Sequence, residues 1–321
     1  MASNSETLVT VFGGSGFLGR NVVRALCRRD YRVRVAVRRP ELAGYLQPSG
    51  KVGQVHVVQA NLRYPASIEA AVRDSDVVIN LVGILVEGGA QSFDAVQAKG
   101  AETVAKAAAA AGSRLIHVSA IGADAESPSR YAKAKAAGEA AVLAAVPSAT
   151  IFRPSVMFGP EDQFTNRFAA LARMSPVLPV IGGATKMQPV YVGDVATAIA
   201  DAVDGKAKAG ATYELGGAEV LTMREIIEAI VAIADRKPAL VPLSFGLARF
   251  QANFLQFAPG MLKLTPDQVT LLARDNVVSD TAKAAGLTLE GLGITADSLE
   301  AIAPQYLWRF RPQGQFQRKS A

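Results

Sequence analysis

Cysteine, histidine and long apolar runs are all scarce in this chain. Its 321 residues include one cysteine, Cys27, and two histidines, His56 and His117. A single cysteine excludes a disulfide framework and a multi-cysteine metal site, and it fits a reducing compartment. Neither histidine has a second ligand at metal spacing, so we expect no metal site. No apolar run reaches the roughly 18 residues that span a bilayer, so we expect no transmembrane helix.

Charged residues are also few, and their balance is basic. Only 19% of the residues are charged and 50% are hydrophobic, which favours a large core and excludes a disordered chain. The net charge of +6 favours acidic partners such as nucleotides, but it is too small to predict nucleic-acid binding. The residues before the first predicted strand lack an apolar signal core and an arginine-rich presequence, so we expect a cytoplasmic protein.

Predicted strands and helices alternate through the first half of the chain. The predicted strand at 77–82 is almost wholly apolar, as expected for a strand covered on both faces. This alternation predicts an α/β fold with a Rossmann-like doubly wound parallel sheet. Prolines and glycines then become frequent. We expect an NADP(H)-binding domain at 1–155 and a smaller, mostly C-terminal α/β substrate-side lobe at 156–321, interleaved with the first.

Gly13, Gly16 and Gly19 form the most informative motif. They follow an apolar run at 8–12 and open a helical pattern that continues to residue 29. Glycines in such a turn let the backbone approach a pyrophosphate, and the helix N-terminus faces the negative charge. The strand–turn–helix context predicts a dinucleotide site, and the alternative is a glycine turn without a ligand.

Arg38 and Arg39 stand at the end of the second predicted strand. An acidic residue about 20 residues beyond the last glycine would hold the ribose 2′-hydroxyl of NAD. Here two guanidinium groups occupy that place, and guanidinium suits a 2′-phosphate. The sequence therefore predicts NADP(H), with a solvated basic strand end as the alternative.

Tyr131 and Lys135 lie four residues apart, on one face of a predicted helix. A free tyrosine has a pKa near 10, and a lysine ammonium one turn away lowers that pKa enough for proton transfer. Ser119 ends the fifth predicted strand and could hydrogen-bond a substrate carbonyl. These three residues are predicted to be catalytic, and the alternative is a surface Tyr–Lys pair.

With these motifs the chain resembles an extended or atypical short-chain dehydrogenase/reductase. The segments at 153–160 and 191–196 are similar to the later family segments, so the resemblance covers about two-thirds of the chain. It implies that the tyrosine transfers a proton, the lysine holds the nicotinamide ribose and the serine orients a carbonyl. The predicted cofactor contacts are Gly13, Ser15, Gly16, Phe17, Leu18, Gly19, Arg38, Arg39, Asn61, Leu62, Val82, Gly83, Tyr131, Lys135, Pro154 and Val156.

The C-terminal third narrows the resemblance. Segments at 264–279 and 306–311 resemble the NADPH-binding accessory subunit of respiratory complex I, in its bacterial form. That resemblance implies a tightly held, structural nucleotide and little or no turnover. It also implies a partner, complex I or another membrane-associated assembly, and a peripheral place on the inner face of the inner membrane.

Two segments are candidate docking surfaces. Residues 243–258 place Leu247, Phe250, Phe254 and Phe257 on one face of a helix too short to cross a bilayer. We favour core packing for this face over contact with a protein or a membrane. The tail at 306–319 mixes aromatic and basic residues, for which we rank protein or membrane docking above a frayed tail and above nucleic-acid binding.

Two main functions follow from the sequence. The first is an NADPH-holding accessory subunit or assembly partner of NADH:ubiquinone oxidoreductase. The alternative is a soluble NADPH-dependent reductase, dehydrogenase or epimerase for a small carbonyl or sugar-nucleotide substrate. A third interpretation is an NADP(H) sensor without catalysis.

Overall fold

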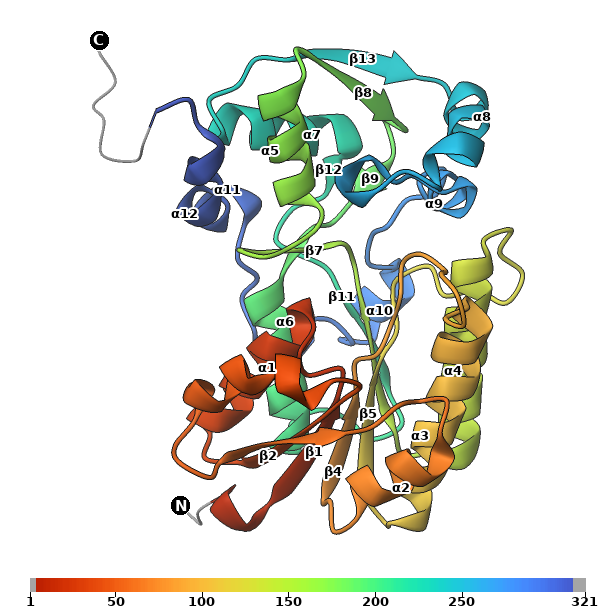
Figure 1. Ribbon diagram of the computed structural model, residues 1–321, viewed down its shortest axis with the longest axis vertical. Coiled ribbons are helices and arrows are strands. Elements are labelled where there is room, and N and C mark those ends of the chain that lie inside the picture. Colours follow the sequence, from red (N-terminus) through yellow and green to blue (C-terminus); the bar gives the residue numbers. More distant parts are fainter. Residues whose placement is uncertain (1–3, 314–321) are drawn as a thin grey trace. The chain divides into compact units, whose positions relative to one another are not determined.

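The computed structural model describes residues 4–313 and divides the chain into two compact units (Figure 1). The first unit comprises residues 1–154, 193–215 and 279–294, and the second comprises the rest. The chain therefore passes between the units at several points and not at one linker. Among the described residues, no helix has both the length and the apolar character needed to cross a membrane.

A seven-stranded sheet forms the centre of the first unit. Its strand order is β11-β6-β5-β4-β1-β2-β3, and every neighbouring pair is parallel. This confirms the predicted doubly wound α/β fold. The strands are β1 (Leu8–Phe12), β2 (Arg32–Val37), β3 (Val55–Gln59), β4 (Val77–Asn80), β5 (Arg114–Val118), β6 (Thr150–Pro154) and β11 (Thr212–Leu215).

Helices cover both faces of this sheet (Figure 1). Alanine and valine side chains from three of them pack against the sheet in one core, which also contains Phe12, Val78, Leu115 and Ile151. Because the sheet is covered on both faces, its central strands are almost continuously apolar. The helices of this unit are α1 (Phe17–Arg28), α2 (Pro65–Val72), α3 (Lys99–Ala110), α4 (Arg130–Ala145), α6 (Val192–Val203) and α10 (Asp280–Ala284).

The strand order reverses between β1 and β4, which are neighbours in the sheet. In open α/β sheets, ligands bind outside the carboxyl ends of the strands at such a reversal. Phe12, Asn80 and His117 lie side by side there, because the register pairs Phe12 with Asn80 and Asn80 with His117. The turns that follow these strands carry the predicted site.

Two elements of this unit differ from the sequence prediction. The predicted strand at 77–82 ends at Asn80, because its side chain accepts a hydrogen bond from the backbone of Val82 and turns the chain. The alanine-rich pattern at 95–111 predicts one continuous helix, but this segment begins as a π-helical turn, η4 (Asp94–Ala98), before α3. π-helical turns are rare and are frequent at functional sites.

The second unit combines short strand pairs with helices. Strand β10 (Val190–Tyr191) pairs with β7 (Met157–Phe158), β12 (Leu221–Thr222) with β9 (Lys186–Met187), and β13 (Ala239–Leu243) with β8 (Val177–Ile181). Thr222 followed by Glu225 predicts a capping box and a helix at 222–234, and α7 (Met223–Ile233) begins with that capping box. The other helices are α5 (Thr165–Met174), α8 (Phe245–Leu255), α9 (Pro266–Leu271), α11 (Leu299–Ile302) and α12 (Pro304–Leu307).

The beginning of the C-terminal tail is part of the second core. Tyr306, Leu307 and Phe310 are buried among residues of α5 and α7. Packing therefore accounts for Tyr306 and Phe310, whereas Trp308 is partly exposed and Arg309 is exposed. Docking by this part of the tail stays a prediction. The remaining basic and aromatic residues of the expected docking tail, at 314–319, lie outside the described residues.

Candidate functional site

The glycine turn between β1 and α1 is packed so closely that side chains do not fit. Gly13 has a φ of +79°, which favours glycine. A Cβ on Gly19 would lie 2.2 Å from the Gly13 carbonyl oxygen, and one on Gly14 would lie 2.7 Å from Val35. Helix α1 then begins at Phe17, with Gly16 at its N-cap. The first backbone N–H groups of a helix lack partners within it and favour an anion.

The other predicted contacts in this turn differ in exposure. Ser15 and Phe17 are partly exposed, whereas the Leu18 side chain is buried in the core. Contact between Leu18 and a nucleotide would therefore use its backbone N–H. The turn thus offers backbone donors and little side-chain chemistry, which suits a pyrophosphate.

Arg38 and Arg39 are exposed just beyond β2. Within residues 4–313, neither guanidinium has a hydrogen bond or an ion pair. Tyr45, which sequence reasoning missed, lies beside the glycine turn: its hydroxyl donates to the Ser15 carbonyl over 2.7 Å. The Tyr45 ring also lies 5.4 Å from the Arg20 guanidinium. Nothing in the local sequence pattern marks this tyrosine, because the contact depends on the fold.

The turn after β4 lies against the glycine turn. A Cβ on Gly13 would come within 3.2 Å of the Val82 side chain and backbone. The structure therefore brings Val82 and Gly83 to the switch point together with Gly13. Leu62 instead packs on Gly100 of α3, and the Asn61 side chain accepts the backbone N–H of Arg63.

Lys135 lies buried at the carboxyl end of β5. Its Nζ donates to the Val118 carbonyl over 3.2 Å and lies 5.9 Å from the centre of the Tyr131 ring. Ser119 directly follows Val118 and is also buried. The fold therefore brings the Tyr131–Lys135 pair, predicted from its spacing, to Ser119, predicted from its place after the fifth strand.

Burial shifts the pKa of the Lys135 ammonium. It lowers the pKa of Lys135 to about 8, and the nearby Glu139 carboxylate opposes part of this effect. Glu139 is itself held by Arg153, whose Nε lies 2.8 Å from its carboxylate. Lys135 is thus a cation whose pKa lies near the physiological range.

The Tyr131 ring is fixed by packing from the neighbouring element. Phe93 meets it edge to face, with the ring centres 5.7 Å apart. The start of α4 is fixed by Ser129, whose hydroxyl accepts the backbone N–H of Ala132. Tyr131 and Lys135 are therefore presented from one rigid helix toward the end of β5.

Two further polar residues near Lys135 were missed as site residues. Gln97 and His117 are each 2% exposed, and their side-chain nitrogen and oxygen atoms have no partner within the described residues. Burial, together with the Lys135 charge, lowers the pKa of His117 to about 3, so this ring is neutral. No sequence pattern marks Gln97, because it lies in an alanine-rich stretch that resembles an ordinary helix.

Pro154 and Val156 fall in different units. Pro154 ends β6, and its carbonyl accepts the backbone N–H of Ile121. Val156 belongs to the second unit, where its backbone N–H donates to the Asn276 side chain over 3.1 Å.

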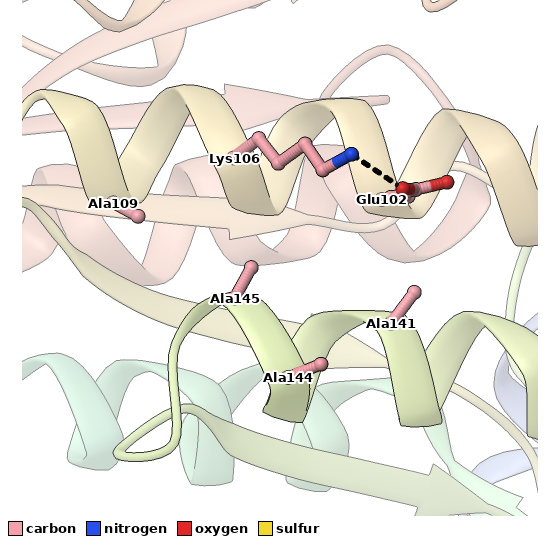
Figure 2. A pocket seen from close by; sticks show the side chains of 6 residues that line it. All are labelled: Glu102, Lys106, Ala109, Ala141, Ala144 and Ala145. Atoms are coloured by element: carbon pink, nitrogen blue, oxygen red, sulfur yellow. Dashed lines mark ion pairs between the residues drawn. The ribbon is translucent and has the colours of Figure 1, made fainter.

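A depression of about 330 Å³ on the first unit does not coincide with this cluster. It lies between α3 and α4 and is lined by alanines and the Glu102–Lys106 ion pair (Figure 2). None of the predicted site residues lines it. It has little chemistry to offer a ligand, and we assign it no role.

Helix α8 exposes its aromatic face. Phe250 and Phe254 of α8, and Phe257 in the turn after it, are 63%, 67% and 83% exposed, while α8 buries only Ala248 and Ala252. Core packing, which we favoured for this face from the sequence, is therefore wrong. Exposed apolar patches of this kind commonly mark binding surfaces.

Comparison with known proteins identifies the family of the chain. Residues 9–216 match the NAD dependent epimerase/dehydratase family. The chain is 38% identical to NADH dehydrogenase (ubiquinone) 1 alpha subcomplex subunit 9, mitochondrial, of Arabidopsis thaliana, across 98% of this chain and 80% of that protein. It is 39% identical to ceramide reductase of Caulobacter vibrioides, across 61% of each.

The fold is shared with solved structures. An NADPH-dependent quinone oxidoreductase from Escherichia coli, complexed with NADPH, superposes with a TM-score of 0.72 at 19% identity. The match covers 94% of this chain and 99% of that one. At this identity the likeness shows the fold alone.

Proposed function

The chain belongs to the NAD dependent epimerase/dehydratase family, and we propose that it is a dinucleotide-holding accessory subunit or assembly partner of NADH:ubiquinone oxidoreductase, respiratory complex I. The observation that carries this proposal is how much of the chain is similar to a subunit of NADH dehydrogenase. The family match ends at residue 216, and the ceramide reductase similarity covers 61% of the chain. The similarity to the NADH dehydrogenase subunit covers 98%, and so includes the second unit.

The exposed face of α8 supports a role within an assembly. Phe250 and Phe254 stack edge to face, with their ring centres 5.5 Å apart, and both face solvent. Burying one such side chain against a partner is worth about 1.5–3 kcal/mol. We propose that α8 docks on the membrane-bound complex, which places the protein at the inner face of the inner membrane.

The first unit fits a nicotinamide dinucleotide. The glycine turn leads directly into the N-terminus of α1, whose backbone N–H groups favour a pyrophosphate. Lys135, Tyr131 and Ser119 lie at the end of β5, where they would contact the nicotinamide half. When bound, the nicotinamide ring would accept or supply a hydride. We further propose NADP(H) over NAD(H), because Arg38 and Arg39 are exposed and without partners within residues 4–313, where a 2′-phosphate would lie.

A second candidate function rests on the same three residues. In a soluble reductase, dehydrogenase or epimerase for a small carbonyl or sugar-nucleotide substrate, Ser119 would hold the substrate oxygen and the Tyr131 hydroxyl would transfer the proton. The positive charge of Lys135 would favour the ionised tyrosine. The similarity to ceramide reductase across 61% of the chain favours this alternative.

Purification of the tagged protein from its native cells tests the proposal. We expect the chain to migrate with complex I on a native gel, and we expect NADP(H) in the nucleotide released from the purified chain. The soluble-reductase alternative predicts a free chain in the cytosolic fraction and NADPH oxidation that Tyr131→Phe abolishes. A chain found only free, with such an activity, would overturn the accessory-subunit proposal.

A further inference from the structure

Every buried polar side-chain atom without a partner within residues 4–313 belongs to one of three residues: Gln97, His117 and Ser119. All three lie near Lys135. Ser119 follows Val118, the residue that accepts the Lys135 hydrogen bond, and Lys135 acts electrostatically on His117. Buried polar groups normally find partners, and exceptions mark functional sites or places that water or a ligand completes.

The backbone of Gln97 is held by close packing. It lies in the π-helical turn η4, and its carbonyl oxygen meets Gly138 of α4, where a Cβ would lie only 2.2 Å away. The backbone of Gln97 is therefore fixed both by the π-helical turn and by its contact with α4. The side chain nevertheless makes no hydrogen bond to any described residue, so packing alone does not account for an amide here.

The Gln97 amide and the Lys135 ammonium converge at Gly83. A Cβ on Gly83 would lie 3.6 Å from Gln97 Oε1 and 3.4 Å from Lys135 Nζ. Glycine leaves this point open, and Gly83 follows β4 at the switch point. A group that both donates and accepts hydrogen bonds, such as a hydroxyl, would satisfy the amide and the ammonium together.

The sheet order indicates which part of a dinucleotide reaches this point. Arg38 and Arg39 follow β2, whereas Lys135 lies at the end of β5, three strand spacings away. That separation is about 14 Å across the sheet. If the arginines hold the 2′-phosphate of the adenosine half, the part of the dinucleotide that reaches Gly83 and Lys135 is the nicotinamide half. The hydroxyl groups that would lie there are those of its ribose.

We propose that Gln97 is a nucleotide-binding residue whose side-chain amide hydrogen-bonds a ribose hydroxyl of the nicotinamide half, beside Lys135. This inference rests on the proposed binding of a nicotinamide dinucleotide. It assigns the Gln97 amide to the ligand: no described protein group satisfies this amide, and a ribose hydroxyl of the bound nucleotide would.

Gln97→Met tests this assignment, because methionine has a similar length and no hydrogen-bonding amide. We expect NADPH to bind the variant roughly three- to tenfold more weakly, as for the loss of one hydrogen bond. Adenosine 2′,5′-bisphosphate, which lacks the nicotinamide ribose, should bind both proteins equally. Calorimetric titration of each ligand measures the two affinities.

The nucleotide-free proteins give a second, independent measurement. Removing an unsatisfied buried amide should leave the thermal unfolding midpoint unchanged or raise it. A residue with a purely structural hydrogen bond would show the opposite pattern, a lower midpoint with unchanged affinity. If Gln97→Met does not fold, Gln97→Glu draws Lys135 into an ion pair and should weaken NADPH while sparing the bisphosphate.

Gln305→Met is the matched control, because Gln305 is exposed on α12 and its amide donates to the Ala301 carbonyl. It should leave both affinities unchanged. The assignment of Gln97 is overturned if Gln97→Met binds NADPH as the unaltered protein does, or weakens both ligands equally. If the unaltered protein binds neither ligand, the proposed function itself fails.

Discussion

At the scale of single residues, Arg38 and Arg39 make the cofactor proposal testable. Replacing both with serine removes the guanidinium groups but leaves the glycine turn intact. One exposed charge-assisted hydrogen bond is worth about 1.5 kcal/mol, so NADPH affinity should fall about tenfold or more. NADH affinity should change less than threefold. Fluorescence titration of the two nucleotides measures the difference.

Arg28→Ser is the control for this pair, since Arg28 is exposed in the last turn of α1. It should leave both affinities as they are. Equal losses for NADH and NADPH in the double variant would show that the arginines act without regard to the 2′-phosphate.

His117 makes the stability of the protein depend on pH. Burial lowers its pKa to about 3, whereas an unfolded histidine titrates near 6.5. As the pH falls below 6.5, His117 binds a proton in the unfolded chain but not in the folded chain. The free energy of unfolding therefore decreases on acidification. Between pH 7 and pH 5, His117 lowers the free energy of unfolding by about 2 kcal/mol. We expect His117→Leu to remove that loss in urea-unfolding measurements.

The other histidine, His56, supplies the matched control, because it is exposed on β3. His56→Leu should keep the same loss of stability between pH 7 and pH 5 as the unaltered protein. Lys135 stays protonated throughout this range, since its pKa is about 8. An unchanged pH slope in His117→Leu would contradict the assignment of this loss to His117.

At the scale of secondary-structure elements, the sequence predicted what local patterns determine. The apolar run before Gly13 and the spacing of Gly13, Gly16 and Gly19 specify a strand, a turn and a helix without help from distant residues. The i, i+4 spacing placed Tyr131 and Lys135 on one face in the same way. Their catalytic and binding roles stay predictions, which the proposed experiments address.

The π-helical turn at Asp94–Ala98 could not be read from the sequence. It depends on α4, where Gly138 admits the Gln97 carbonyl at a distance no side chain would allow. An alanine-rich segment has the same sequence pattern whether all of its turns are α-helical or one of them is π-helical. Gln97 therefore became visible only once the two helices were placed together.

Helix α8 shows why periodicity alone cannot decide between core and surface. Phe250 and Phe254 share one face, as predicted, whereas Phe257 lies beyond the end of the helix, and the buried face is formed by Ala248 and Ala252. The pattern locates an apolar face and does not say what covers it. In the tail, an aromatic residue expected on a docking surface is buried instead. Phe310 is packed in the core, and the guanidinium groups of Arg173 and Arg309 lie 5.7 and 5.1 Å from its ring.

At the scale of the whole molecule, the proposed functions map onto different units. The glycine turn, the arginines after β2 and the Lys135 cluster belong to the first unit, while α8 belongs to the second. The family match ends at residue 216, but the similarity to the NADH dehydrogenase subunit continues through the second unit. Nucleotide binding and docking should therefore be separable by substitution.

Phe250→Ser combined with Phe254→Ser tests that separation. Both side chains are largely exposed, so the double variant should fold normally and bind NADPH within twofold of the unaltered protein. It should lose at least tenfold in its association with complex I on native gels, because each phenylalanine buried on docking contributes about 1.5–3 kcal/mol. Met174→Ser, also exposed and in the second unit, should retain both properties. A double variant that still migrates fully with the complex would remove α8 from the docking surface, and one that loses NADPH would show that the two functions are coupled.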